Sequence, residues 1–149
     1  MKQLDIIFNL RRDIDNIEER LVELRQMTQP KSQVISDMPR GGGERRNAIE
    51  EYLIKSEKLA KQLDYKRRKL EDHWEEACIL FREAKVTVAQ CEMLKERFYH
   101  AKPWKACLKR MSEVYPDSKW NEQKLFRMYR DVIYKINKVK KSNIVNIAN

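Results

Sequence analysis

A segment between residues 119 and 130 is rich in cationic and amide side chains. Its members are Lys119, Asn121, Gln123, Lys124, Arg127 and Arg130. Arginine and lysine make charge-assisted hydrogen bonds to phosphate, and arginine, asparagine and glutamine can pair with the edges of bases. These residue types predict a surface that recognises nucleic acid. Further candidates for phosphate contacts are Lys102, Lys105, Lys135 and Lys138. Lys140 and Lys141 follow them, where they can complement the helix C-terminus or reach phosphates.

The distribution of charge supports the same interpretation. Residues 86–149 carry 14 Lys and Arg against 6 Asp and Glu, whereas residues 1–85 carry 18 against 17. Nearly all of the net charge of +9 therefore lies in a C-terminal module. The positive electrostatic potential of this module attracts a polyanion. Nucleic acid, a polyanion of defined shape, is the partner that we expect.

Two helices are expected to position the polar segment. Pro103 suits the first position of a short helix whose apolar face is formed by Trp104, Cys107, Leu108, Met111 and Tyr115. Asn121 is a good N-cap for a longer helix, in which Leu125, Met128, Val132, Ile136 and Val139 form the buried side. A scaffold helix followed by a helix with an exposed basic face is the plan of a helix-turn-helix.

A third helix is expected before these two. Thr87 and Gln90 have the spacing of a capping box, so a helix should begin there and continue to about His100. Its buried stripe is expected to contain Val88, Cys91, Leu94 and Phe98.

The N-terminal part of the sequence predicts two long helices. Apolar residues recur at spacings of three and four from Ile7 to Leu24, and again from Ile49 to Phe81 except at Ser56 and Lys66. Their narrow apolar stripes favour an antiparallel, coiled-coil-like hairpin. The second helix is longer, so Leu70, Trp74, Ala77 and Phe81 are expected to overhang and need cover. The cover can come from the C-terminal module or from a second copy of the chain, and of these we favour a homodimer formed through the arm.

The connector between these helices ends in an unusual string. Pro39, Arg40, Gly41, Gly42 and Gly43 are expected to form a hinge, or a backbone nest for an anion. The string lacks the Gly-Lys-Ser/Thr ending of a phosphate-binding P-loop.

The sequence thus predicts an all-α protein with a long helical hairpin followed by a three-helix helix-turn-helix domain. The expected divisions are an arm at 1–85 with a hinge loop at 28–43, a DNA-binding domain at 86–141 and a tail at 142–149. We expect no enzyme activity, cofactor or metal, since Asp and Glu alternate with Lys and Arg as on solvated helix faces. The sequence has no apolar run long enough to predict a membrane segment, so we expect a cytoplasmic location.

Several short motifs resemble a known family. Residues 94–99 (LKERFY), 103–105 (PWK) and 125–129 (LFRMY) resemble the sigma-factor region-4-like helix-turn-helix of small phage regulators, the RinA/ArpU group and its relatives. The MPRGGG string at 38–43 is similar to a signature of those relatives. In that family the turn between the two last helices is tight, whereas residues 112–121 form a longer connection here.

The resemblance implies a transcription regulator from a phage or prophage of a Gram-positive bacterium, acting on late packaging and morphogenesis genes. It places Arg127 on the recognition helix and Trp104 on the scaffold helix. The expected partners are double-stranded DNA, a second copy of the chain and, as a further candidate, host RNA polymerase. Two alternatives are a small terminase-like packaging subunit, which a ring of eight or more copies would favour, and a helical interaction protein that binds no DNA.

Overall fold

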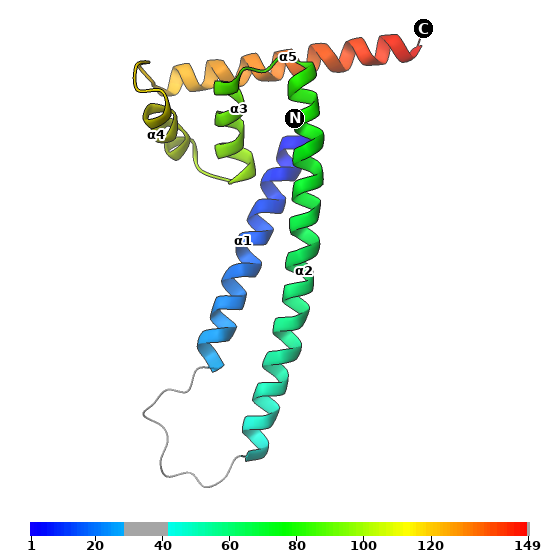
Figure 1. Ribbon diagram of the computed structural model, residues 1–149, viewed down its shortest axis with the longest axis vertical. Helices are drawn as coiled ribbons and strands as arrows, with labels where there is room; N and C mark the ends of the chain where they lie inside the picture. The colour runs from blue at the N-terminus through cyan, green and yellow to red at the C-terminus, as the bar shows by residue number, and fades with distance from the viewer. Residues whose placement is uncertain (29–41, 149) are drawn as a thin grey trace. The chain divides into compact units, whose positions relative to one another are not determined.

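Every regular element of the described residues is helical. The computed structural model describes residues 1–28 and 42–148, and no strand is present among them (Figure 1). The helices are α1 (Lys2–Thr28), α2 (Gly42–Glu83), α3 (Val88–Leu94), the π-helical η1 (Lys95–Tyr99), α4 (Trp104–Val114) and α5 (Glu122–Ala148). The prediction of an all-α protein is therefore confirmed.

The chain divides into two compact units. Met1–Arg12 and Lys69–Asn149 form what we call the terminal unit, and Asp13–Arg68 form the middle unit. The terminal unit thus combines α3, η1, α4 and α5 with the start of α1 and the end of α2. The first turns of the chain pack with its C-terminal half.

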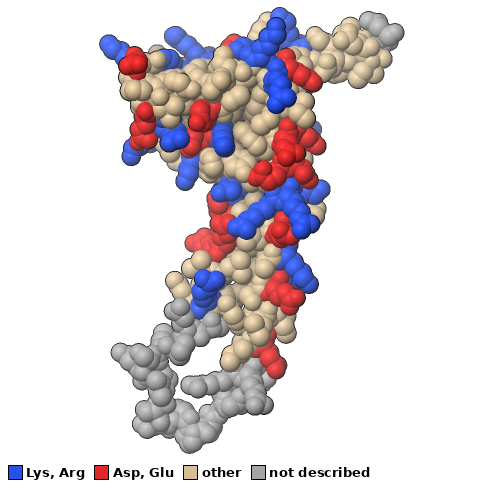
Figure 2. All heavy atoms as spheres, viewed as in Figure 1, with Lys and Arg blue, Asp and Glu red and all other residues tan. Residues whose placement is uncertain are grey.

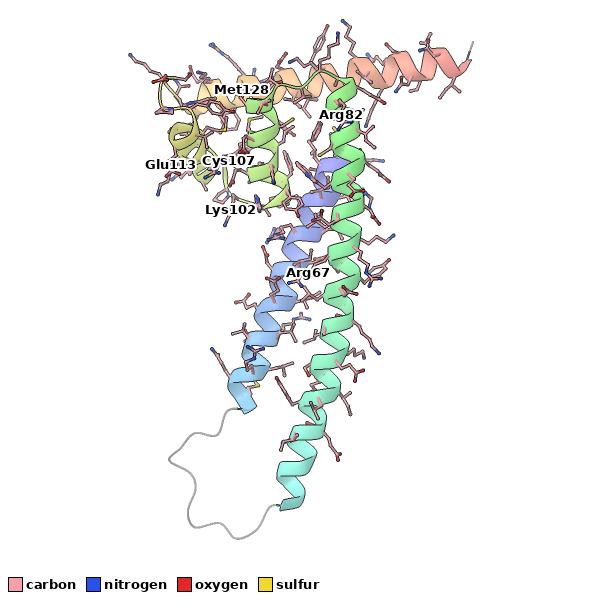
Figure 3. All side chains as sticks on the ribbon, viewed as in Figure 1. Arg67, Arg82, Lys102, Cys107, Glu113 and Met128 are labelled. Atoms are coloured by element: carbon pink, nitrogen blue, oxygen red, sulfur yellow. The ribbon has the colours of Figure 1, made fainter. Side chains whose placement is uncertain are left out.

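In the middle unit the remaining parts of α1 and α2 run antiparallel. Ile14 and Ile17 of α1 and Leu63 of α2 are buried, as the spacing of apolar residues predicts. Two ion pairs join the helices beside this seam. Lys66 Nζ lies 3.2 Å from Asp13 Oδ2. Arg67 Nη2 lies 2.7 Å from Glu18 Oε1, and Arg67 is labelled in Figure 3. Both pairs are exposed, so their contribution to stability is small.

The terminal unit holds a single apolar core. Its buried side chains from the long helices are Leu4, Ile7, Leu70, Ala77 and Phe81, and those from the C-terminal segments are Met93, Leu94, Phe98, Cys107, Met111, Leu125, Val132 and Ile136. α3 contacts both α4 and α5 (Figure 1).

The expected overhang at the end of α2 is wrong. Leu70, Ala77 and Phe81 are buried inside the terminal unit of the same chain, because antiparallel pairing places the end of α2 beside the beginning of α1. These side chains therefore give no reason to expect a second copy. In the middle unit, the large apolar residues Ile49, Leu53 and Ile54 of α2 are exposed instead.

Some helix limits differ from the expected ones. Residues 142–149 were expected to be a tail, but α5 continues to Ala148. The expected hinge or nest falls largely outside the described residues: Pro39, Arg40 and Gly41 are not described, while Gly42 and Gly43 belong to the first turn of α2.

The capping box at the start of α3 is confirmed. The Gln90 backbone N donates to Thr87 Oγ1 over 3.2 Å, and the Thr87 backbone N donates to Gln90 Oε1 over 3.0 Å. The expected stripe is only partly correct. Leu94 and Phe98 are buried, but Val88 in the first turn is 78% exposed, and Gln90 is buried in its place.

Gln90 is buried because it has polar partners on α5. Its amide Nε2 donates to Asp131 Oδ2 over 2.7 Å, and Lys135 Nζ donates to Gln90 Oε1 over 3.1 Å. Lys135 also pairs with Asp131 at 3.1 Å. The three side chains satisfy one another and fix α5 against the start of α3.

This network predicts a pH dependence of stability. The hydrogen bonds from Gln90 and Lys135 hold the pKa of Asp131 below its usual value. A lowered folded-state pKa gives stability that is present above the unfolded-state pKa of about 3.9 and is lost as the pH falls through the folded-state value. We expect Asp131→Asn to flatten the decline of unfolding free energy below about pH 4. Urea unfolding from pH 7 to 3 measures this, with Asp117→Asn as a control at an exposed carboxylate.

Candidate nucleic-acid interface

The N-terminus of α5 is fixed by local interactions. Asn121 is its N-cap, as predicted, because the backbone N of Lys124 donates to Asn121 Oδ1 over 2.8 Å. The seven residues from Tyr115 to Asn121 connect α4 to α5. Trp120 closes this connection by donating from Nε1 to the Tyr115 carbonyl over 3.0 Å. The connection is thus longer than the usual three- to four-residue turn, but it is held in place.

One face of α5 carries an exposed polar and aromatic stripe, which we call the α5 stripe. Its members are Gln123, Phe126, Arg127, Arg130, Tyr134, Asn137, Lys138 and Lys141, all of them exposed. The spacings of three and four place them on one side of the helix. The stripe has four positive charges and no carboxylate. At about 1.5 Å per residue it extends over roughly 27 Å.

The α5 stripe lies opposite the side by which α5 packs. Leu125, Val132 and Ile136 are buried on that other side, and Met128, labelled on α5 in Figure 3, is half-buried. Two shallow depressions occur along the stripe. One is lined by Gln123, Phe126, Arg127 and Arg130, and the other by Tyr134, Asn137, Lys138 and Lys141.

The cations of the stripe are available for an external partner. None of Arg127, Arg130, Lys138 and Lys141 has a carboxylate within 4.0 Å among the described residues. In Figure 2 blue side chains project along the edge of the terminal unit where α5 lies. An unpaired, exposed row of cations can neutralise an external anion without first breaking an internal ion pair.

The six residues expected to bind nucleic acid fall into two groups. Gln123, Arg127 and Arg130 share the α5 stripe. Lys119, Asn121 and Lys124 lie in the connection or at the start of the helix, away from that line. Asn121 uses its side-chain oxygen as the helix cap, and Lys124 Nζ lies 4.3 Å from the centroid of the Trp120 ring. Only the first group is brought together on one face.

The four expected phosphate contacts also differ in their surroundings. Lys138 belongs to the α5 stripe, and Lys102 and Lys105 are exposed before and at the start of α4. Lys135 is half-buried and bonded to Gln90 and Asp131, so its charge is already compensated inside the chain.

Three members of the stripe were missed in the sequence: Phe126, Tyr134 and Asn137. A helical period continued from Gln123 and Arg127 would have found them, because each lies three, four or a multiple of about 3.6 residues further along. Phe126 and Tyr134 were missed because aromatic residues in a helix are expected on its buried side.

Aromatic packing supports the stripe from behind. The Trp104 ring of α4 lies 5.4 Å from the Phe126 ring and 5.4 Å from the Tyr129 ring, measured between centroids. Tyr129 stacks on Phe98 of η1 at 5.9 Å, and Phe98 meets Phe8 of α1 at 6.5 Å. The first half of α5 is therefore connected through rings to three other elements of its unit.

The Arg97 guanidinium completes this aromatic cluster. Its Cζ lies 4.9 Å from the centroids of both Phe8 and Trp104, and its Nη1 donates to the Lys102 carbonyl over 2.9 Å. Cation–π contacts of this kind favour a charge that is partly removed from water. Arg97 thus helps to hold the chain on both sides of the turn before α4.

The cysteines and acidic groups of the described residues do not favour other chemistry. The thiols of Cys78, Cys91 and Cys107 are free, and burial raises the pKa of each, to about 11 for Cys107, labelled in Figure 3. A raised pKa disfavours the thiolate that nucleophilic chemistry uses. No group of three or more His, Cys, Asp or Glu in the described part could hold a metal ion. The helices described here include none with the length and apolar character needed to cross a membrane.

Comparison of this chain with models of protein families, with curated proteins and with solved structures found no match. The geometry of the α5 stripe is therefore the main guide to function.

Proposed function

We propose that this chain is a DNA-binding transcription regulator of phage or prophage origin. The observation that carries the proposal is the α5 stripe, an exposed row of cations, amides and aromatic rings that lacks carboxylates. In a protein of net charge +9, such a helix face suits the negatively charged major groove of duplex DNA. The resemblance of residues 94–129 to the RinA/ArpU group adds the regulatory role and the control of late genes.

In this proposal α4 and α5 act as the helix-turn-helix and α3 with η1 forms its first helix. α4 would serve as the scaffold, since Cys107 and Met111 on one of its sides are buried. α5 would serve as the recognition helix, with Gln123, Arg127 and Arg130 at base edges. The α5 stripe extends over roughly 27 Å on a straight helix, so it leaves a groove about 12 Å wide before its end. Lys138 and Lys141 would therefore meet phosphates.

The proposal assigns the two long helices to an arm. We propose that α1 and α2 form an antiparallel hairpin that joins two copies of the chain or contacts host RNA polymerase. The exposed residues Ile49, Leu53 and Ile54 are apolar enough for such a contact.

Salt-dependent binding to duplex DNA tests the function. The full chain is used to select ligands from a library of random duplexes, and the affinity for a selected duplex is measured by fluorescence anisotropy at about 50 and about 200 mM salt. With Lys138 and Lys141 at phosphates, affinity should fall roughly tenfold between these conditions. Enrichment of no sequence, together with no salt-sensitive binding to any duplex, would contradict the proposal.

A further inference from the structure

Phe126 is an exposed residue in the lining of the first depression on the α5 stripe. Its side chain is 36% exposed and shares this depression with Gln123, Arg127 and Arg130. An aromatic ring among three hydrogen-bonding side chains forms a small apolar spot on an otherwise polar surface. The core does not need this ring, because Leu125 and Val132 fill the buried side of the same turns.

The position of the Phe126 ring is fixed by its neighbour. Trp104 contacts it edge-to-face, with an interplanar angle of 67°, and is itself held by Arg97 and Tyr129. A ring supported in this way loses little conformational entropy when it meets a ligand. Phe126 is therefore a preorganised apolar contact rather than a loose surface side chain.

The major groove presents one apolar group to such a contact. Among the base edges that face this groove, only thymine carries a methyl group, at C5. Gln123 and Arg127, which flank Phe126, suit purine bases next to such a thymine. Arginine pairs with guanine, and glutamine pairs with adenine.

We propose that Phe126 reads the C5-methyl group of a thymine that lies next to purines contacted by Gln123 and Arg127. This inference rests on the proposed function, and it adds a specificity-determining residue and the chemical group that it recognises. The α5 stripe then combines hydrogen-bond readout of purines with apolar readout of thymine.

Replacement of thymine by deoxyuridine tests the proposal, because it removes the methyl group and keeps base pairing. A duplex selected by the full chain is synthesised with each thymine replaced in turn. We expect one or two positions at which affinity falls roughly three- to fivefold, the equivalent of one buried methyl group. In Phe126→Ala the same replacements should have no effect, whereas Val88→Ala, at an exposed apolar residue of α3 outside the stripe, should retain the sensitivity of the wild-type chain. Circular dichroism checks that both variants keep their helix content.

The outcomes separate the inference from the function. Salt-sensitive duplex binding without any loss on deoxyuridine replacement would overturn the role of Phe126 and leave the DNA-binding proposal standing. Persistence of the deoxyuridine effect in folded Phe126→Ala would do the same. No binding to any duplex, or binding to single strands alone, would overturn both. The wild-type measurement decides the question even where Phe126→Ala fails to fold.

Discussion

Replacing Arg127 and Arg130 together by Ala is expected to abolish most of the affinity for duplex DNA. Each arginine that reads a base or a phosphate contributes about 1–3 kcal/mol, so the double variant should bind roughly 30-fold to 10⁴-fold more weakly. Both side chains are exposed on one face and lack an ion pair among the described residues, so their loss should leave the fold intact. Anisotropy with a selected duplex at two salt concentrations measures the change.

The salt dependence separates the two kinds of contact. If one arginine meets a phosphate, the slope of log affinity against log salt should fall by about one, and the loss should be similar for all sequences. If it reads a base, the slope should stay nearly constant and specificity should relax at one position. The single variants Arg127→Ala and Arg130→Ala assign these effects to each residue.

A matched control removes the same charge from the same unit. Lys109 on α4 and Lys140 on α5 are exposed and do not belong to the α5 stripe. Lys109→Ala with Lys140→Ala lowers the net charge by the same amount as the arginine pair. An equal loss of affinity in this control would mean that only overall charge matters and would contradict groove recognition by the stripe.

Local signals in the sequence predicted the starts of helices well. The capping box of Thr87 and Gln90 and the N-cap of Asn121 depend on residues three positions apart, so they can be recognised without knowledge of the fold. The buried positions Leu125, Val132 and Ile136 follow from helical period alone. These signals define the elements that carry the stripe.

Features that depend on distant residues could not be predicted in this way. Gln90 is buried and Val88 exposed because Gln90 bonds to Asp131, 41 residues away. The expected overhang was placed at the wrong part of α2 because apolar period does not say which turns pair across two helices. Nothing in the local sequence indicates that Phe8 of α1 would pack on Phe98.

The packing of Phe98 leads to the second large expected effect. Phe98 is 5% exposed and lies between Phe8 and Tyr129, so it joins the first turns of the chain to η1 and α5. Phe98→Ala removes these contacts and leaves a cavity. We expect the unfolding free energy of the terminal unit to fall by about 3–5 kcal/mol, as for other buried Phe to Ala changes. Urea unfolding followed by circular dichroism and by tryptophan fluorescence measures the loss.

Tyr134→Ala provides the control for this experiment. Tyr134 is also an aromatic residue of the terminal unit, but it is 68% exposed on the α5 stripe, so its removal should change the unfolding free energy by less than about 0.5 kcal/mol. The proposed function adds a second expectation. Phe98→Ala should weaken DNA binding only through the unfolding of α5, so a temperature low enough to keep it folded should restore the affinity. A stability of Phe98→Ala within about 1 kcal/mol of the wild type would contradict the role of Phe98 in joining these elements.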